Sequence, residues 1–187
     1  MTNEKISTKV VTGIVRFSYE HVFEPKAIAE GAAPKYSVSI VIDKDDKTTL
    51  DKVKRAIEAA YKEGQYKLKG SSKTIPALSA IKTPLRDGDT ERPDDPAYKN
   101  KYFINANSPT KPGVVDAACN EIIDPSAFYS GCYGRASITF FAYNTNGNRG
   151  IAVALNHVQK LKDGERLGGK SSAEEDFGAS SDEDILD

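Results

Sequence analysis

The stretch from Cys132 to Gln159, CYGRASITFFAYNTNGNRGIAVALNHVQ, decides the fold of this chain. Its two arms, 132–143 and 150–159, are rich in apolar and aromatic residues, and Asn and Gly dominate the six residues between them. A turn of that composition joins antiparallel neighbours, so the sequence predicts a long β-hairpin. In the first arm the even positions are small or apolar, whereas the odd positions carry Arg, hydroxyl and aromatic side chains. We expect the odd face to meet solvent and to be the better binding surface.

Working outward, two further segments alternate with a period of two and predict strands at 8–19 and 35–42. Shorter strands are expected at 102–107 and 113–116, and a helical turn at 124–130. In the first strand Phe17 and Tyr19 fall on the apolar side with Val11 and Val15, so we expect at least one of the two rings in the core.

One segment changes to a helical period after Asp46, which can cap a helix. Its apolar positions recur at spacings of three and four: Leu50, Val53, Ile57 and Tyr61. The sequence therefore predicts one amphipathic helix that ends near Gly64. The following residues, 65–100, contain many turn formers and little pattern. They could be a nucleic-acid-contacting loop or an arm for dimerisation, and the sequence leaves both open.

These elements amount to five or six strands with one inserted helix and no alternation of strands with helices. That order favours a mainly β protein, a barrel or a sandwich, of which the OB-type barrel is one member. The length suits one domain over residues 1–165. The N-terminus has no apolar signal region and no run reaches the 18 or more residues of a membrane span, so we expect an intracellular, soluble protein.

Residues 166–187 form an acidic tail by composition, and we expect it to be flexible. From Ser171 onward there are seven carboxylates and no Lys or Arg: Glu174, Glu175, Asp176, Asp182, Glu183, Asp184 and Asp187. The whole chain has a net charge of −1, with 26 Lys and Arg and 27 acids, so residues 1–170 carry about +6. The near-neutral net charge of the whole chain conceals the positive charge of residues 1–170. Such a charge suits a polyanionic partner; the alternative is that it is spread evenly over a soluble surface.

Basic and aromatic residues interleave on the predicted strands, as a groove for single-stranded nucleic acid requires. Aromatic rings stack on bases at ~1–3 kcal/mol per base, while Lys and Arg neutralise phosphates. The candidate phosphate contacts are Arg16, Lys35, Lys101 and Arg135. The candidate stacking residues are Tyr36, Tyr102, Tyr133, Phe141 and Tyr143. The competing interpretation is that aromatic residues on strands belong to the core.

Signatures of catalysis and of metal binding are weak. Cys119 and Cys132 have no zinc-ligand spacing and are expected to be small core residues. No glycine-rich phosphate loop is present. Acidic residues could hold Mg²⁺ in a nuclease, but they stand beside Pro and Gly, where Asp is a common turn former: Asp94, Asp95, Asp116 and Asp124. We expect no cofactor, no metal and no enzymatic activity; a metal-dependent nuclease and a structural adaptor are the alternatives.

Three segments carry a resemblance to a known family: YFINANSPTKPGVVD (102–116), DPSAFYSGCYGRASITFFAY (124–143) and LNHVQKLKDGERLGGKSSAEEDF (155–177). The chain resembles the single-stranded DNA-binding proteins of tailed bacteriophages, from about Val10 to Phe177. The sequence contains no Trp, so stacking would fall to Tyr and Phe, and its final DILD lacks the terminal aromatic residue of some tailed binders.

The resemblance implies an OB-fold core that binds single-stranded DNA with little sequence preference in phage replication or recombination. It also implies self-association, as a homodimer or larger assembly, in the cytoplasm of an infected bacterial host. The acidic tail would recruit phage or host replication and recombination proteins and would compete with DNA. Phe177, or the pair Ile185 and Leu186, would be its apolar anchor.

Overall fold

The computed structural model describes residues 7–27 and 29–167. Its strands join into one sheet with the order β1-β7-β2-β3-β5-β8-β6, and an additional pairing of β7 with β8 closes the ring. Strands β1 to β4 are Lys9–Val11, Val15–Lys26, Lys35–Asp43 and Arg86–Asp87. Strands β5 to β8 are Lys101–Ser108, Gly113–Val115, Tyr133–Thr145 and Asn148–Lys162. The closed ring of β2, β3, β5, β8 and β7 is a barrel of the OB type, which confirms the expected fold.

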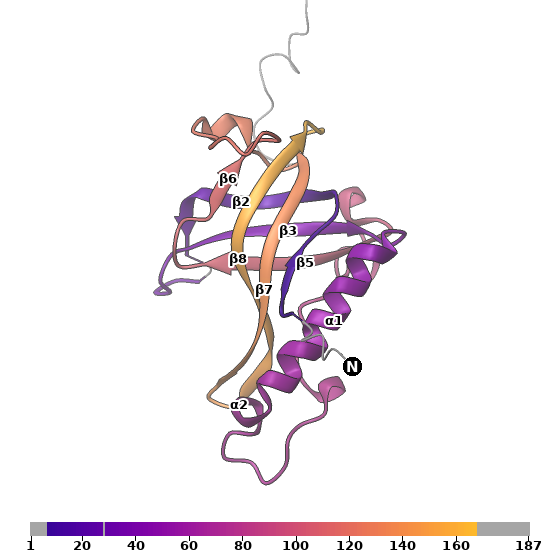
Figure 1. Cartoon of the computed structure of the whole chain (residues 1–187), viewed down its shortest axis with the longest axis vertical. Helices are drawn as coiled ribbons and strands as arrows, with labels where there is room; N and C mark the ends of the chain where they lie inside the picture. Colours follow the sequence, from indigo (N-terminus) through magenta and orange to yellow (C-terminus); the bar gives the residue numbers. More distant parts are fainter. Residues whose placement is uncertain (1–6, 28, 168–187) are drawn as a thin grey trace, which may run out of the picture.

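The barrel is flattened into two layers that cross one another. In Figure 1 the long β7–β8 hairpin runs vertically in front of β2, β3 and β5, which run across it. Side chains from both layers meet in a single buried cluster, including Ile40 and Ile104 from one layer and Ile138 and Leu155 from the other. The outward side chains of each layer therefore lie outside this core cluster.

The β7–β8 hairpin follows the predicted alternation. Gly134, Ala136, Ile138, Phe140 and Ala142 are buried, and the odd positions between them are exposed or half-buried. At the tip, Asn146 and Gly147 have positive φ angles of 52° and 83°. A two-residue turn with both φ values positive matches the right-handed twist of the flanking strands, which is why Asn-Gly is favoured there.

Strand β2 departs from the predicted alternation at one point. Phe17 is fully buried, as expected of at least one of the two rings, but Tyr19 is 56% exposed. The register with β3 shifts between Ser18 and His21, and Tyr19 has a φ of 45°. This bulge inserts an extra residue, so Tyr19 turns to the outer face instead of following Phe17 into the core.

The predicted helix is α1, Lys47–Glu63. The Asp46 carboxylate accepts a hydrogen bond from the Thr49 backbone N–H at its start, and the helix ends at Gly64. Its apolar stripe packs against β7, where a Cβ on Gly64 would lie 2.2 Å from the Cβ of Ala142. That close approach explains a glycine at this position. In Figure 1 the helix flanks the lower right of the barrel.

Residues 65–100 are more ordered than their composition indicates. They contain α2 (Gln65–Lys69), α3 (Gly88–Glu91) and two short 3₁₀ turns, η1 (Leu78–Ala80) and η2 (Pro96–Tyr98). Strands β5 and β8 pair directly only at Asn107 and Ala154. Lys82 pairs with Gly150 of β8, and β4 pairs with β5. The insertion therefore lines the gap between two barrel strands.

Three smaller expectations have mixed outcomes. The expected helical turn is present as η3 (Pro125–Ala127). Cys132 is buried as expected, but the prediction for Cys119 is wrong, because it is exposed in a turn with a φ of 64°. None of the helices within the described ranges has the length and apolar composition needed to span a bilayer.

Candidate nucleic-acid interface

A hollow of about 310 Å³ lies on the outer face of the layer formed by β2, β3 and β5. We call it the sheet groove. The side chains that line it are mostly polar or aromatic: Tyr19, His21, Lys26, Ser37, Ser39, Arg92, Asn105 and Asn107. In an OB-type barrel this face of the second and third long strands is where oligonucleotides bind.

Polar side chains cross the floor of the sheet groove in register. His21 pairs with Ser37, which pairs with Asn107, and the next outward position places Ser39 beside Asn105. Burial, and then the charge of Lys26, lower the pKa of His21 below its ordinary value. The imidazole is therefore uncharged at neutral pH. The floor offers hydrogen-bond donors and acceptors without a fixed charge pattern, which suits contact with varied bases.

Arg92 closes one end of the groove with its guanidinium set among three aromatic rings. Its central carbon lies 4.9 Å from the ring centroid of Tyr19, 4.7 Å from that of Tyr98 and 4.9 Å from that of Phe103. These are cation–π distances, so the charge is held in place without a carboxylate partner in those contacts. An exposed ring and a positioned cation therefore stand side by side.

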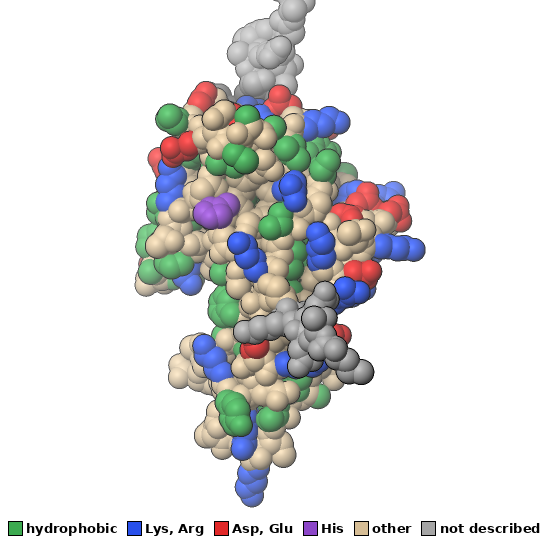
Figure 2. Space-filling model, viewed as in Figure 1, with side chains coloured by type: hydrophobic (Ala, Val, Ile, Leu, Met, Phe, Trp, Pro, Cys, Tyr) green, Lys and Arg blue, Asp and Glu red, His purple; other side chains and the backbone are tan. Residues whose placement is uncertain are grey.

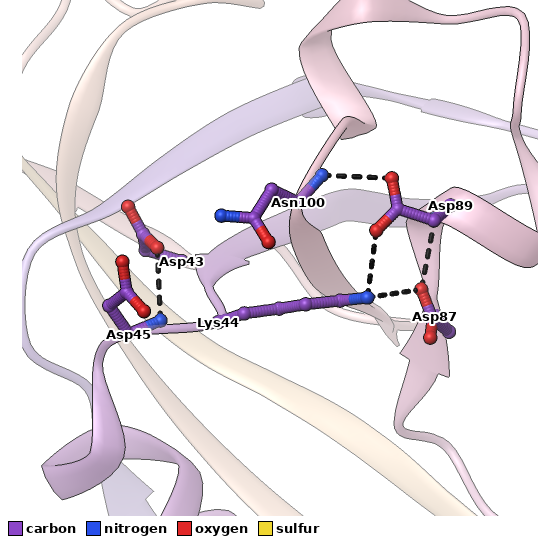
Figure 3. A network of polar contacts seen from close by, with 6 residues as sticks. All are labelled: Asp43, Lys44, Asp45, Asp87, Asp89 and Asn100. Carbon is purple, nitrogen blue, oxygen red and sulfur yellow. Dashed lines mark hydrogen bonds and ion pairs between the residues drawn. The ribbon is translucent and has the colours of Figure 1, made fainter.

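Residues 86–100, which we call the strap, bring Arg92 to this position. Lys44 binds Asp87 at 2.9 Å and Asp89 at 2.8 Å, and the Asn100 backbone N–H donates to Asp89 (Figure 3). The hydrogen bonds from Lys44 lower the pKa of both carboxyl groups. These are surface contacts of modest strength, so packing must also hold the strap.

That packing comes from a second small cluster on the outer side of the sheet. Tyr98 and Phe103 meet edge to face at 5.1 Å and bury Val41 with them. The Tyr98 hydroxyl hydrogen-bonds to Ser39, at the edge of the groove, over 3.1 Å. The strap therefore covers one end of the sheet and leaves the rest of its outer face open.

Cations also stand at the other end of the groove. Lys26 and Lys35 are directly paired residues of β2 and β3. Lys111, in the loop after β5, lies 5.7 Å from the ring centroid of Phe23. With Arg92 at one end and these lysines at the other, the uncharged floor lies between positive charges, an arrangement that suits a chain of phosphates.

The nine residues expected to contact DNA do not form one surface. Lys35, Lys101 and Arg16 lie on the outer side of the layer that holds the sheet groove. The Lys101 ammonium pairs with Asp43 at 3.0 Å. The Arg16 guanidinium donates to the carbonyl oxygens of Gly131 and Glu165, and it lies 5.2 Å from the Tyr133 ring.

The other six divide between the core side of the sheet and the hairpin. Tyr36 and Tyr102 alternate with outward residues and share the side of Ile40 and Ile104, and both are half-buried. The remaining four occupy odd positions of β7 and face outward: Tyr133, Arg135, Phe141 and Tyr143. Figure 2 looks onto the layer of β7 and β8 and shows blue side chains spread across it.

Sequence reasoning missed most of the sheet groove. Asn105 and Asn107 could have been found, because they alternate with the buried Ile104 and Ala106 in a predicted strand. Tyr19 carried no signal, since its outward position depends on the bulge. Arg92 stands in the poorly patterned segment and reaches the groove only through tertiary packing of the strap.

Three of the four acidic positions considered for a metal act as turn formers. Asp95, Asp116 and Asp124 each accept a hydrogen bond from a backbone N–H two residues later. Within residues 7–27 and 29–167 no group of three or more His, Cys, Asp or Glu side chains could hold a metal ion. The tail residues expected to bind partners lie outside the described residues: Glu174, Glu175, Asp176, Phe177, Asp182, Glu183 and Asp184.

The chain is similar to known phage proteins in sequence and in fold. Residues 8–186 match the sequence profile of a family described as Enterobacter phage Enc34, ssDNA-binding protein. The chain is 29% identical to putative protein p50 of Acyrthosiphon pisum secondary endosymbiont phage 1, over 95% of this chain and 98% of that protein.

The solved structures that share the fold include two proteins from different phages. One is the single-stranded DNA-binding protein from bacteriophage Enc34 in complex with ssDNA, with a TM-score of 0.74 and 26% identity. The similarity covers 86% of this chain and 90% of that one. The other is gp2.5, a single-stranded DNA-binding protein encoded by bacteriophage T7, with a TM-score of 0.60 over 88% and 97% of the two chains. Its 13% identity shows a shared fold alone.

A half-buried carboxyl on β2, next to His21 of the groove, makes stability depend on pH. Burial raises the pKa of Glu20 from 4.5 to about 7. The folded chain therefore holds this proton more tightly than the unfolded chain, so the stabilisation is full below about pH 4.5 and is lost as the pH rises through 7. We expect the Tm of the wild type to fall relative to that of Glu20→Gln over this range, as measured by calorimetry.

The matched control for that measurement is Glu24→Gln, which changes an exposed carboxylate of the same strand and should keep the wild-type pH dependence. A constant difference in Tm between wild type and Glu20→Gln from pH 4.5 to 8 would contradict the assignment.

Proposed function

The chain belongs to the family of the Enterobacter phage Enc34 ssDNA-binding protein, and on that basis we propose that it binds single-stranded DNA in phage replication or recombination. The observation that carries the proposal is the sheet groove, where an exposed tyrosine and a positioned arginine stand beside an uncharged polar floor between positive ends. The protein acts by covering the strand and not by catalysis, in the cytoplasm of the infected host.

In this proposal the strand lies across β2, β3 and β5. A base stacks on Tyr19, and phosphates pair with Arg92, Lys26 and Lys35. The floor residues adjust to whichever base lies above them, because hydroxyl and amide groups can both donate and accept hydrogen bonds. Binding with little sequence preference follows from stacking and charge, neither of which reads a base pattern.

The residues singled out from the sequence fit this proposal in two ways. Lys35, Arg16 and Lys101 share the side of the groove and extend its positive surroundings. The outward aromatic and basic residues of β7 would hold the strand only if it continued around the barrel onto the hairpin face. A direct comparison of the two faces therefore decides the path of the strand.

Two further properties are proposed from the family and the composition. The protein self-associates as a homodimer or larger assembly, and its acidic residues 171–187 recruit replication or recombination proteins. At a tethered concentration on the order of mM, seven carboxylates would also compete with DNA phosphates for the groove.

Titration with a dT oligonucleotide at several salt concentrations tests the main proposal. Three cations beside the groove give an expected slope of about −2 for log affinity against log salt, at ~−0.7 per phosphate. We expect weaker binding to duplex of the same length and no cleavage of labelled strand with Mg²⁺ or Mn²⁺. Salt-independent affinity, preference for duplex, or cleavage products would each overturn the proposal.

Alanine variants of two exposed aromatic residues locate the strand. Tyr19→Ala should weaken binding of single-stranded DNA by about 5- to 150-fold, since one stacked base contributes ~1–3 kcal/mol. Tyr19→Phe should bind as the wild type does. Phe141→Ala, on the hairpin face, should change the affinity less than about twofold. A larger loss from Phe141→Ala than from Tyr19→Ala would move the strand to the hairpin.

Removal of the acidic residues tests their competition with DNA. Deletion of 171–187 should tighten binding of single-stranded DNA severalfold at low salt, and the gain should shrink near 0.15 M, where the Debye length is about 8 Å. The matched control keeps the length and replaces the seven acids by Asn or Gln. It should behave like the deletion, and unchanged affinity in both variants would refute the competition.

A further inference from the structure

A second positive surface lies at the lower end of the molecule, away from the sheet groove. It consists of residues 62–82 and the turn of the β7–β8 hairpin up to Arg149, and we call it the basic lobe. Residues 62–82 contain five lysines and a single acid, Glu63, and residues 144–149 add Arg149 without an acid. Figure 1 shows the hairpin tip beside α2, and Figure 2 shows blue side chains around a green patch at this tip.

The basic lobe is an ordered frame, unlike a charged tail. The Asn144 side chain donates to the Lys67 carbonyl at 3.0 Å, and the Tyr61 hydroxyl donates to the Pro76 carbonyl at 2.7 Å. Lys82 exchanges backbone hydrogen bonds with Arg149 and Ile151 of β8. The backbone segments that carry the lysines are therefore held in place, and this limits the distances between the lysine charges.

An exposed aromatic ring stands among these charges. Tyr66, on α2, is 88% exposed, and Lys67 and Lys69 follow it on the same short helix. Ile75 adds an apolar side chain that is 42% exposed. A tyrosine so open to water between cations has the two properties that a stacking platform for single-stranded nucleic acid needs.

A hollow of about 520 Å³ in the same lobe offers a place for an anion. Lys82 and Arg149 line it together with Pro76, residues 79–81 and residues 147–148 of the hairpin turn. The Arg149 Nε is buried and has no hydrogen-bond partner within the described part of the chain. The Nη2 atom of Arg149 donates to the Ser72 hydroxyl, so the guanidinium is anchored at the wall of the hollow, where its positive charge favours an anion such as a phosphate.

The basic lobe and the sheet groove are joined by β8. Arg149 precedes Ala154 by five residues, and Ala154 pairs with Asn107 at the edge of the groove. Five residues of strand span about 17 Å. A single strand that leaves the groove can therefore reach the lobe within the 4–16 nucleotides that one OB barrel covers.

We propose that the basic lobe is a second contact surface for single-stranded DNA, which engages strands longer than the sheet groove can hold. This inference rests on the proposed function. Bases stack on Tyr66, and Lys67, Lys73 and Arg149 neutralise phosphates. An acidic protein segment would match the charge as well, but it offers few planar groups to the open tyrosine ring, whereas every nucleotide carries a base, so the DNA strand is the better fit.

The test compares oligonucleotides of increasing length, from dT of about 6 to about 30 nucleotides. For the long strands, Lys67→Ala/Lys73→Ala and Tyr66→Ala should each weaken binding roughly five- to tenfold. The double variant should also reduce the salt slope by about 1.4, for two phosphates at ~0.7 each. For the shortest strands both variants should bind as the wild type does.

The matched control is Lys47→Ala/Lys54→Ala, which removes two exposed lysines from α1 and should have no effect at any length. Equal binding by wild type and lobe variants at every length would overturn this inference and leave the proposed function intact. It would also be overturned if the lobe variants kept their DNA affinity but lost binding of a labelled 171–187 peptide, since the lobe would then receive acidic protein. Absence of any single-strand binding by the wild type would instead refute the proposed function, and this inference with it.

Discussion

Closure of the barrel by β7 is the interaction on which the rest of the structure depends. β7 pairs with β8 along nearly its whole length and, on its other edge, with β1 and β2. Without it both layers would have open edges and no shared core. Because the ring is closed, every strand has one face in the core and one outside. The sheet groove is built on outer positions that this closure leaves free.

The sheet groove owes its chemistry to two departures from regular structure. The bulge in β2 turns Tyr19 outward at a positive φ, a conformation that is uncommon for a residue with a bulky side chain. The strap then brings Arg92 against that ring from a segment more than 70 residues away in the sequence. Regular alternation alone would have given a polar sheet face with neither a stacking ring nor a positioned cation.

Prediction from the sequence succeeded where local pattern and tertiary packing agree. The hairpin and the helix after Asp46 each carry a period that burial preserves. In β3 the alternation sets the direction of the side chains, but the strap also buries the outward Ser39 and Val41. The sequence did not indicate most of the groove, because the positions of Tyr19 and Arg92 depend on contacts between segments that lie far apart in the sequence. Arg16 and Arg135, which looked free, donate hydrogen bonds to backbone carbonyls of distant segments. Composition shows that residues 1–170 are basic and contain Tyr and Phe. It does not show which outer face of the barrel carries these residues.

The pairing of the first strands with β7 also sets the order in which a newly made chain can fold. Lys9 pairs with Thr139 and Val15 with Gly134, so the partners stand 130 and 119 positions apart in the sequence. At 5–20 residues per second, the ribosome needs roughly ten seconds to supply the closing strand. During that time β2 and β3 can pair, but their apolar face has no second layer. The emerging chain is therefore most prone to aggregation before the hairpin is made, and rapid synthesis of its last third favours correct folding.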